Sequence, residues 1–260
     1  MLLSEVNSAS GFFGLVPWIV FAPVLGMIIN MLLGKRLGEK GVGAVASLAA
    51  GAAFLVSVLL AVSLAGHPEG AIVRLTEWIH IGSLNLDWAF RVDTLSVTMM
   101  LVVSGVGTLI HIYAIGYMHE DVRYKHDEGR FTRFFVFLNL FIAAMMILVS
   151  GDNYLMLFVG WEGVGLASFL LIGFWYDMDT LGRASWANSN AAKKAFITNR
   201  VGDFGFLIAG FLMFWHLGSF QFDAVFAAAP EVAHAEPWVI TAITVFMLIG
   251  VAGKSAQIPL

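Results

Sequence analysis

The stretch YLMLFVGWEGVGLASFLLIGFWY, residues 154–176, contains a single charged residue, Glu162. The hydrocarbon core of a bilayer is about 30 Å thick, and a helix needs about 20 apolar residues to cross it. This stretch is therefore long and apolar enough to be a transmembrane helix. It places a carboxyl group near mid-membrane, where an ionisable side chain costs at least about 2.5–3.5 kcal/mol.

The rest of the chain repeats this apolar pattern. Of the 260 residues, 59% are hydrophobic and 12% are charged, with a mean hydropathy of +0.85. A soluble protein carries roughly 25% charged residues, and one with this composition would expose large apolar patches and aggregate. We therefore predict an all-α polytopic membrane protein with about seven spans. These spans cover residues 12–33, 42–65, 93–118, 134–149, 154–176, 195–215, and the chain from about residue 238 onward.

Residues 72–90 alternate between apolar and polar side chains and are too polar to span a membrane. Such alternation, with Gly82-Ser83 at its centre, predicts a β-hairpin. Its tryptophans, Trp78 and Trp88, favour a position at the membrane surface. The chain thus divides into residues 1–118, with three helices and the hairpin, and residues 134–260, with helices four to seven.

The basic residues indicate the orientation of the spans. Ten lie in the loops after the first, third and fifth spans, and two lie on the opposite side. The ten are Lys35, Arg36, Lys40, Arg123, Lys125, Arg130, Arg133, Arg183, Lys193 and Lys194, and the two are Arg74 and Arg91. We expect the N-terminus to face the periplasm of a bacterial inner membrane. Because residues 1–10 contain Glu5 and no basic residue, we expect no cleaved signal peptide and a retained first helix.

Four ionisable residues fall inside predicted spans: Glu162 in the fifth, Arg200 and Asp203 in the sixth, and Lys254 in the seventh. Arg200 and Asp203 are three residues apart on one helix and could simply neutralise each other. Glu162 has no basic residue near it on its own helix. The glycines that follow it, at positions 163 and 165, would allow another helix to approach closely.

Lys254 precedes Pro259 by five residues, and the proline ring would clash with the helical carbonyl of Ser255. A helix break at membrane depth is tolerated only where protein or a water-filled cavity satisfies the freed backbone groups. Burial favours the neutral forms of Glu and Lys, whereas proximity to each other favours their charged forms. We therefore hypothesise that Lys254 and Glu162 influence each other's hold on a proton along a hydrated path.

Other residue types restrict the chemistry. The absence of cysteine excludes disulfides, thiolate zinc sites and cysteine-ligated iron–sulfur clusters from this chain. His111 lies within the third span, but the other spans offer no second histidine for a bis-histidine haem site. A single histidine in a helix is more often a polar core residue whose hydrogen bonds are satisfied. Asp93 is placed to cap the third helix. We expect no cofactor, no metal ion and no redox centre, and a net charge of −4 gives no reason to expect nucleic-acid binding.

Four motifs closely resemble subunit L of bacterial NADH:quinone oxidoreductase, the equivalent of mitochondrial chain 5 in respiratory complex I. The resemblance covers nearly the whole chain, and the fifth- and seventh-helix motifs are specific to the wider antiporter-like family. The motifs are Ile110-His-Ile-Tyr-Ala-Ile-Gly-Tyr-Met118, Val159-Gly-Trp-Glu-Gly-Val-Gly165, Asn199-Arg-Val-Gly-Asp203 and Gly253-Lys-Ser-Ala-Gln257.

This resemblance implies an inverted-repeat bundle in which each repeat has one broken helix and one intramembrane Glu–Lys system. Glu162 matches the family's fifth-helix acid, Lys254 its seventh-helix lysine, and Arg200 and Asp203 the charged pair of the sixth helix. The implied function is proton translocation coupled to quinone reduction elsewhere in the complex, with other membrane subunits, lipid and protons as partners. Family members continue well beyond residue 260, so we expect a fragment or one piece of a split gene that stops within the broken helix.

Three alternatives stay open from sequence. The first is the large subunit of a multisubunit sodium/proton antiporter, or of a membrane-bound hydrogenase relative, which shares the Glu and Lys motifs. The second is a cofactor-binding membrane protein of the cytochrome b type. The third is a structural module whose intramembrane charges only fix the packing of its helices.

Overall fold

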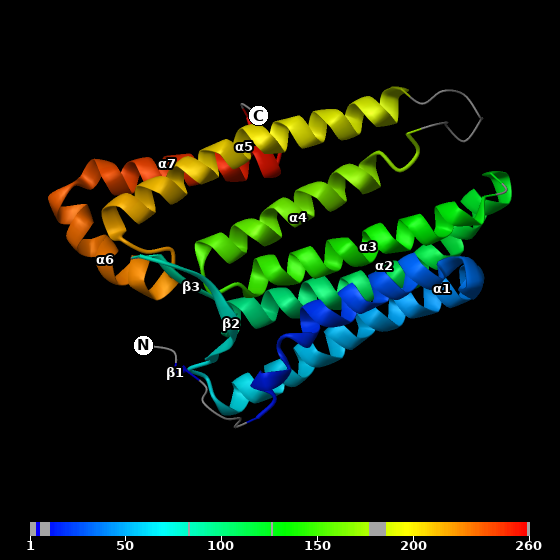
Figure 1. Cartoon of the computed structure of the whole chain (residues 1–260), viewed down its shortest axis with the longest axis horizontal. Helices are drawn as coiled ribbons and strands as arrows, with labels where there is room; N and C mark the ends of the chain where they lie inside the picture. The colour runs from blue at the N-terminus through cyan, green and yellow to red at the C-terminus, as the bar shows by residue number, and fades with distance from the viewer. Residues whose placement is uncertain (1–3, 6–10, 83, 126, 177–185, 259–260) are drawn as a thin grey trace.

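The computed structural model describes residues 4–5, 11–82, 84–125, 127–176 and 186–258. Long helices run side by side, with the strands and α6 at one end of the bundle (Figure 1). The elements in chain order are β1 (Ser4–Glu5), η1 (Phe13–Leu15), α1 (Trp18–Gly66), β2 (Ala71–Ile81), β3 (Leu84–Val92), α2 (Thr94–Lys125), α3 (Glu128–Ser150), α4 (Tyr154–Ile172), α5 (Trp186–Leu217), α6 (Phe222–Ala235) and α7 (Pro237–Lys254).

The fold is that of an all-α polytopic membrane protein, as predicted. Six helical segments within the described residues are long and apolar enough to cross a membrane. The first, Phe13–Gly66, is interrupted at Gly38, whose φ of 63° and ψ of 179° are not helical. Its two halves lie against each other, because the Asn30 side chain donates a hydrogen bond of 3.1 Å to the Val42 carbonyl. The first two predicted spans are thus the two arms of one helical hairpin.

Several polar connections predicted from sequence are helical instead. The predicted charged loop at residues 119–133 is mostly the end of α2 and the beginning of α3, and α5 begins at Trp186, nine residues before the predicted span. A buried ion pair of 2.8 Å between Arg130 and Asp121 joins the two helices, and the Trp175 indole donates to the same carboxylate at 2.7 Å. Once paired, these charges can be buried inside helices rather than solvated in loops.

The helix α6 occupies a segment that the sequence predicts to be a loop. One face of this helix is apolar: Val225 is buried, and Val232 packs on the same cluster, which includes Met213 and Val239. Its acidic residues obscured this pattern in the sequence. Because α6 has 14 residues, it is too short to span and lies across the end of α5 and α7 (Figure 1).

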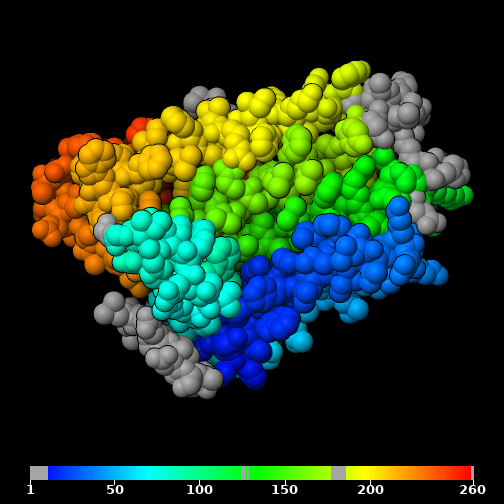
Figure 2. All heavy atoms as spheres, in the orientation of Figure 1, coloured from blue at the N-terminus to red at the C-terminus, as the bar shows by residue number. Residues whose placement is uncertain are grey.

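The predicted hairpin is present. Strands β2 and β3 are antiparallel from the pair Ala71–Val92 to the pair Ile81–Leu84, and β1 adds to β2 in parallel. Gly82 has a φ of 60°, which suits the tight turn, whereas Ser83 lies outside the described residues. Phe90 and Val92 are fully buried in a cluster with Phe13 and Met100, so the hairpin is packed onto the bundle. Figure 2 shows its atoms covering this end of the helices.

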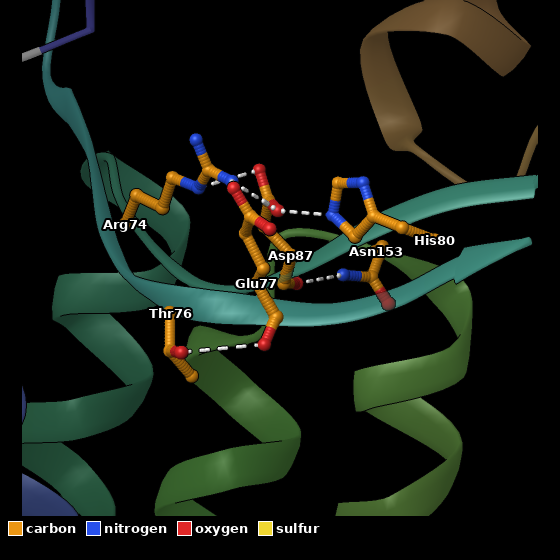
Figure 3. A network of polar contacts seen from close by, with 6 residues as sticks. All are labelled: Arg74, Thr76, Glu77, His80, Asp87 and Asn153. Carbon is orange, nitrogen blue, oxygen red and sulfur yellow. Dashed lines mark hydrogen bonds and ion pairs between the residues drawn. The ribbon is translucent and has the colours of Figure 1, made fainter.

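A polar network centred on Asp87 fixes the outer face of the hairpin (Figure 3). The Asp87 carboxylate lies 2.8 Å from Arg74 and 3.0 Å from His80, both on the facing strand. The Asp87 carbonyl accepts a 3.1 Å hydrogen bond from the Asn153 side chain, in the turn between α3 and α4. The same asparagine caps α4, because its side chain accepts from the Met156 amide. The hairpin is thereby attached to the start of the helix that carries Glu162.

Candidate functional site

The four ionisable residues predicted for the site lie on three helices that pack together. Glu162 lies in the middle of α4, Arg200 and Asp203 lie within α5, and Lys254 is the last residue of α7. All four fall within segments able to span a membrane. The fold thus brings together residues that are up to 92 positions apart in the sequence.

Arg200 is shared by the two carboxylates. Its guanidinium lies 2.5 Å from the Glu162 carboxylate on the neighbouring helix and 3.9 Å from that of Asp203 on its own helix. Asp203 is buried, with 8% of its side chain exposed, whereas the Arg200 side chain is 46% exposed and lies over the Phe196 ring. The intrahelical pair that the sequence suggested is therefore the longer of the two contacts, and the closest partner of Glu162 comes from another helix.

Lys254 contacts neither carboxylate directly in the described part of the chain. Its ammonium donates a 3.1 Å hydrogen bond to the Trp161 carbonyl and lies 5.5 Å from the centre of the Trp161 ring. The helix ends at this lysine: Ser255 is its C-cap, and Ala256 has a φ of 51°. The helix end agrees with a break at this depth, although Pro259, on which the prediction rested, lies outside the described residues.

Trp161 is the residue that sequence reasoning missed. Its indole Nε1 donates a 2.7 Å hydrogen bond to Asp203, and its carbonyl accepts from Lys254. Its ring also stacks on Phe206 at a centroid distance of 5.7 Å. A tryptophan buried in an apolar helix needs a partner for its N–H group, and its position beside Glu162 was the signal that could have identified it. Through Trp161, Lys254 is linked to the Asp203 carboxylate.

Glycines allow close contacts between helices at the site. A Cβ atom at Gly253 would lie 3.0 Å from the Gly202 Cα atom and 3.1 Å from the Thr198 carbonyl oxygen, so α5 and α7 are in backbone contact just before Lys254. At Gly165 the missing side chain leaves room for the Lys254 ammonium, which would be 3.4 Å from an added Cβ. At Gly163 the neighbour is Ala144 of α3. The predicted close helix approach is confirmed at Gly163, whereas Gly165 makes room for a lysine side chain.

A second charged cluster lies at the hairpin end of the bundle, outside the spans. Arg91 of β3 forms ion pairs of 2.8 Å with Asp152, in the turn between α3 and α4, and of 3.0 Å with Asp223 of α6. Burial raises the pKa of Asp152 to about 6, against the opposing effect of Arg91, and the nearby carboxylates of Asp223 and Asp93 add to the rise. This cluster joins three elements that sequence reasoning could not place together.

Two further sequence interpretations can be compared with the structure. The Asp93 carboxylate accepts a 2.8 Å hydrogen bond from the Ser96 amide at the start of α2, so it caps that helix as predicted. His111 is fully buried, with Nδ1 2.7 Å from the Gly107 carbonyl and Nε2 2.7 Å from the Asn139 side chain. It is thus a polar core residue with two partners. Among the described residues, no group of three His, Cys, Asp or Glu side chains could hold a metal ion.

The fold defines a polytopic membrane protein that carries a cluster of charged residues between its helices. Residues 78–135 match the family model for the N-terminus of NADH-ubiquinone oxidoreductase (complex I) chain 5. Residues 151–260 match the model for the transmembrane region of NADH:quinone oxidoreductase and the Mrp antiporter. The chain belongs to this antiporter-like family.

Within the family, the chain is similar to subunit L of NADH-quinone oxidoreductase. It is 44% identical over 249 residues to subunit L of Mycobacterium tuberculosis, covering 94% of this chain and 36% of the relative. It is 40% identical to subunit L of Rhodobacter capsulatus, covering 92% and 33%. It is 37% identical to NADH-ubiquinone oxidoreductase chain 5 of Allomyces macrogynus, covering 93% and 35%. The chain therefore spans about a third of the length of these relatives.

Two solved structures share the fold. A chain of the membrane-bound sulfane sulfur reductase, an archaeal respiratory membrane complex, superposes with a TM-score of 0.73 at 13% identity, covering 92% of this chain and 44% of that one. A chain of the Mrp complex from Dietzia superposes with a TM-score of 0.70 at 21% identity, covering 93% and 24%. Both are members of multisubunit membrane complexes, and at these identities the likeness concerns the fold.

Proposed function

We propose that this chain forms the N-terminal part of a proton-translocating subunit of NADH:quinone oxidoreductase. The oxidoreductase activity belongs to the whole complex, in which quinone is reduced outside this chain. This chain contributes the intramembrane proton path. Its partners are then other membrane subunits, lipid and protons. The protein lies in a bacterial inner membrane with its N-terminus in the periplasm, which agrees with the uneven distribution of basic residues.

The observation that carries the proposal is the sharing of Arg200 between Glu162 and Asp203, with Lys254 linked to Asp203 through Trp161. A proton that binds Glu162 neutralises the carboxylate and thereby weakens the ion pair between Glu162 and Arg200. The guanidinium then shifts toward Asp203, 3.9 Å away, and neutralises that carboxylate instead. Lys254 loses the stabilising field of both carboxylates and releases its own proton more readily. Proton uptake at Glu162 and proton release at Lys254 are thereby coupled without direct contact between them.

The test is proton pumping by inverted membrane vesicles driven by NADH. Glu162→Gln keeps the shape of the side chain, but the amide cannot bind and release a proton as a carboxylate does. We expect acidification to be largely lost while NADH oxidation is still detectable. The matched control is Glu120→Gln on α2, a carboxylate whose side chain is 57% exposed and pairs with Arg123 of its own helix. We expect the control to pump normally.

Unchanged acidification by a correctly assembled Glu162→Gln complex would make Glu162 a packing residue and would favour the structural module. The family model that matches residues 151–260 also names the Mrp antiporter, which supports a sodium/proton antiporter subunit as the second candidate. That candidate predicts proton movement that requires a sodium gradient and no NADH. The same vesicles, supplied with sodium and without NADH, separate the two functions.

A further inference from the structure

A hollow opens between α3, α4 and α5 at the end of the bundle opposite the hairpin. Its volume is about 320 Å³, which is within the range of small-molecule sites. Its walls are mainly apolar and aromatic, formed by Phe137 of α3, Phe169 and Leu170 of α4, and Phe174 just after α4. We refer to this feature as the α3–α5 hollow. Nothing in the proposed proton path uses it.

Two cations line the α3–α5 hollow, and none of the described residues in its lining is acidic. Arg133 comes from α3 and Lys193 from α5. The Arg133 guanidinium is held by ring contacts of 4.9 Å to Phe174 and 5.4 Å to Tyr176. In the described part of the chain no carboxylate pairs with Arg133 or Lys193, in contrast to Arg130, which is buried against Asp121.

The depth of these groups follows from their positions along the helices. Arg133 lies in the second turn of α3 and Lys193 in the second or third turn of α5, and both helices begin at this end of the bundle (Figure 1). Tyr176 also lies at this end and is an amphipathic residue typical of the membrane interface. The phenylalanine walls reach further along α3 and α4. We therefore expect the charged side of the hollow to lie at headgroup level and the apolar side within the hydrocarbon.

We propose that the α3–α5 hollow binds one anionic phospholipid. The phosphate would lie between Arg133 and Lys193, with the hydroxyl of Ser189, one helical turn before Lys193, as a third donor. An acyl chain would cover Phe137 and Phe169. Basic pockets between transmembrane helices are known to bind such headgroups, and the arginine fork suits a phosphate particularly well. A free anion would gain nothing from the apolar walls, which is why the occupant is a lipid.

The test uses the full-length subunit, purified and delipidated in a neutral detergent. Native mass spectrometry follows the binding of phosphatidylglycerol, with phosphatidylcholine and inorganic phosphate as separate arms. We expect one tightly bound phosphatidylglycerol and weaker binding of the other two probes. In the double variant Arg133→Gln/Lys193→Gln the affinity should fall about 30-fold, from about 1 kcal/mol for each basic residue near the membrane surface.

The matched control is Lys40→Gln/Lys194→Gln, which removes the same charge at the same end from two exposed residues that do not line the hollow. It should bind like the wild type. Ser189→Trp fills the hollow without changing its charge and should also lose the lipid, which tests the apolar space separately from the charges. A thermal denaturation midpoint close to that of the wild type shows that each variant is folded. Equal losses in both double variants, or equal affinity for phosphatidylcholine, would overturn the proposal. So would the absence of a bound lipid because another protein segment covers the hollow.

Discussion

The backbone contact between α5 and α7 holds Lys254 at its place, and Gly253→Ala tests this directly. The added Cβ atom would lie 3.0 Å from the Gly202 Cα atom and 3.1 Å from the Thr198 carbonyl oxygen. Both neighbours are backbone atoms, so no side chain can rotate away. Because carbon atoms normally approach to about 3.5–4.0 Å, the two helices must separate by roughly 0.5 Å.

The expected cost follows from two opposing effects. Forcing an extra methyl group into a close-packed contact costs about 1–3 kcal/mol. Alanine is favoured over glycine inside a helix by about 0.8–1.0 kcal/mol, which offsets part of this cost. Since the next residue is Lys254, a shift of α7 also lengthens the 3.1 Å hydrogen bond from its ammonium to the Trp161 carbonyl. We therefore expect lower stability and impaired pumping together.

Gly116→Ala on α2 is the matched control, because a Cβ atom there meets nothing within 4 Å. It gains the helical preference of alanine without the steric contact. The difference between the two variants therefore isolates that contact. The assays are the thermal denaturation midpoint of the purified subunit and NADH-driven acidification of inverted vesicles. If Gly253→Ala matched Gly116→Ala in both, the idea that this contact positions Lys254 would be refuted.

Three other substitutions test separate parts of the structure. Trp161→Phe keeps an aromatic ring beside Lys254 but removes the hydrogen-bond donor to the buried Asp203. A hydrogen bond to a charged group contributes about 1.5–3 kcal/mol, so the thermal denaturation midpoint should fall. A midpoint equal to that of the wild type would count against the link between Trp161 and Asp203. For Asp152, whose pKa is raised from 3.8 to about 6, the folded state binds the proton more tightly than the unfolded state. Its contribution to stability is therefore fully present below about pH 4 and is lost as the pH rises through about 6. Asp152→Asn should make the denaturation midpoint depend less on pH across this window. A pH dependence equal to that of the wild type would contradict the raised pKa of Asp152. Gly38→Ala should lower the midpoint by a cost of about 1–3 kcal/mol, because its φ of 63° and ψ of 179° lie in a region essentially restricted to glycine; Gly116→Ala again serves as the control.

The amino-acid sequence by itself determined the class of fold. Apolar blocks of membrane-spanning length predict helices wherever they occur, because backbone groups in lipid must be satisfied within the helix. The alternation over residues 72–90 predicts the hairpin, and the glycine at position 82 predicts its turn. Local capping was also readable, since Asp93 bonds the amide of a residue only three positions away. Each of these features depends on near neighbours in the chain.

The four charged members of the candidate site could likewise be identified in advance, because a charge inside an apolar span is conspicuous, whereas Trp161 was not. Their partners could not. Glu162, Asp203 and Lys254 lie on different helices that are apolar on most sides, so the sequence does not show which face of each helix meets a neighbour. The ion pair between Arg200 and Glu162 forms only because of the rotation and relative height of α4, α5 and α7. The same packing places Trp161 between Lys254 and Asp203. Pairings across helices are decided by packing, and packing is a property of the tertiary structure alone.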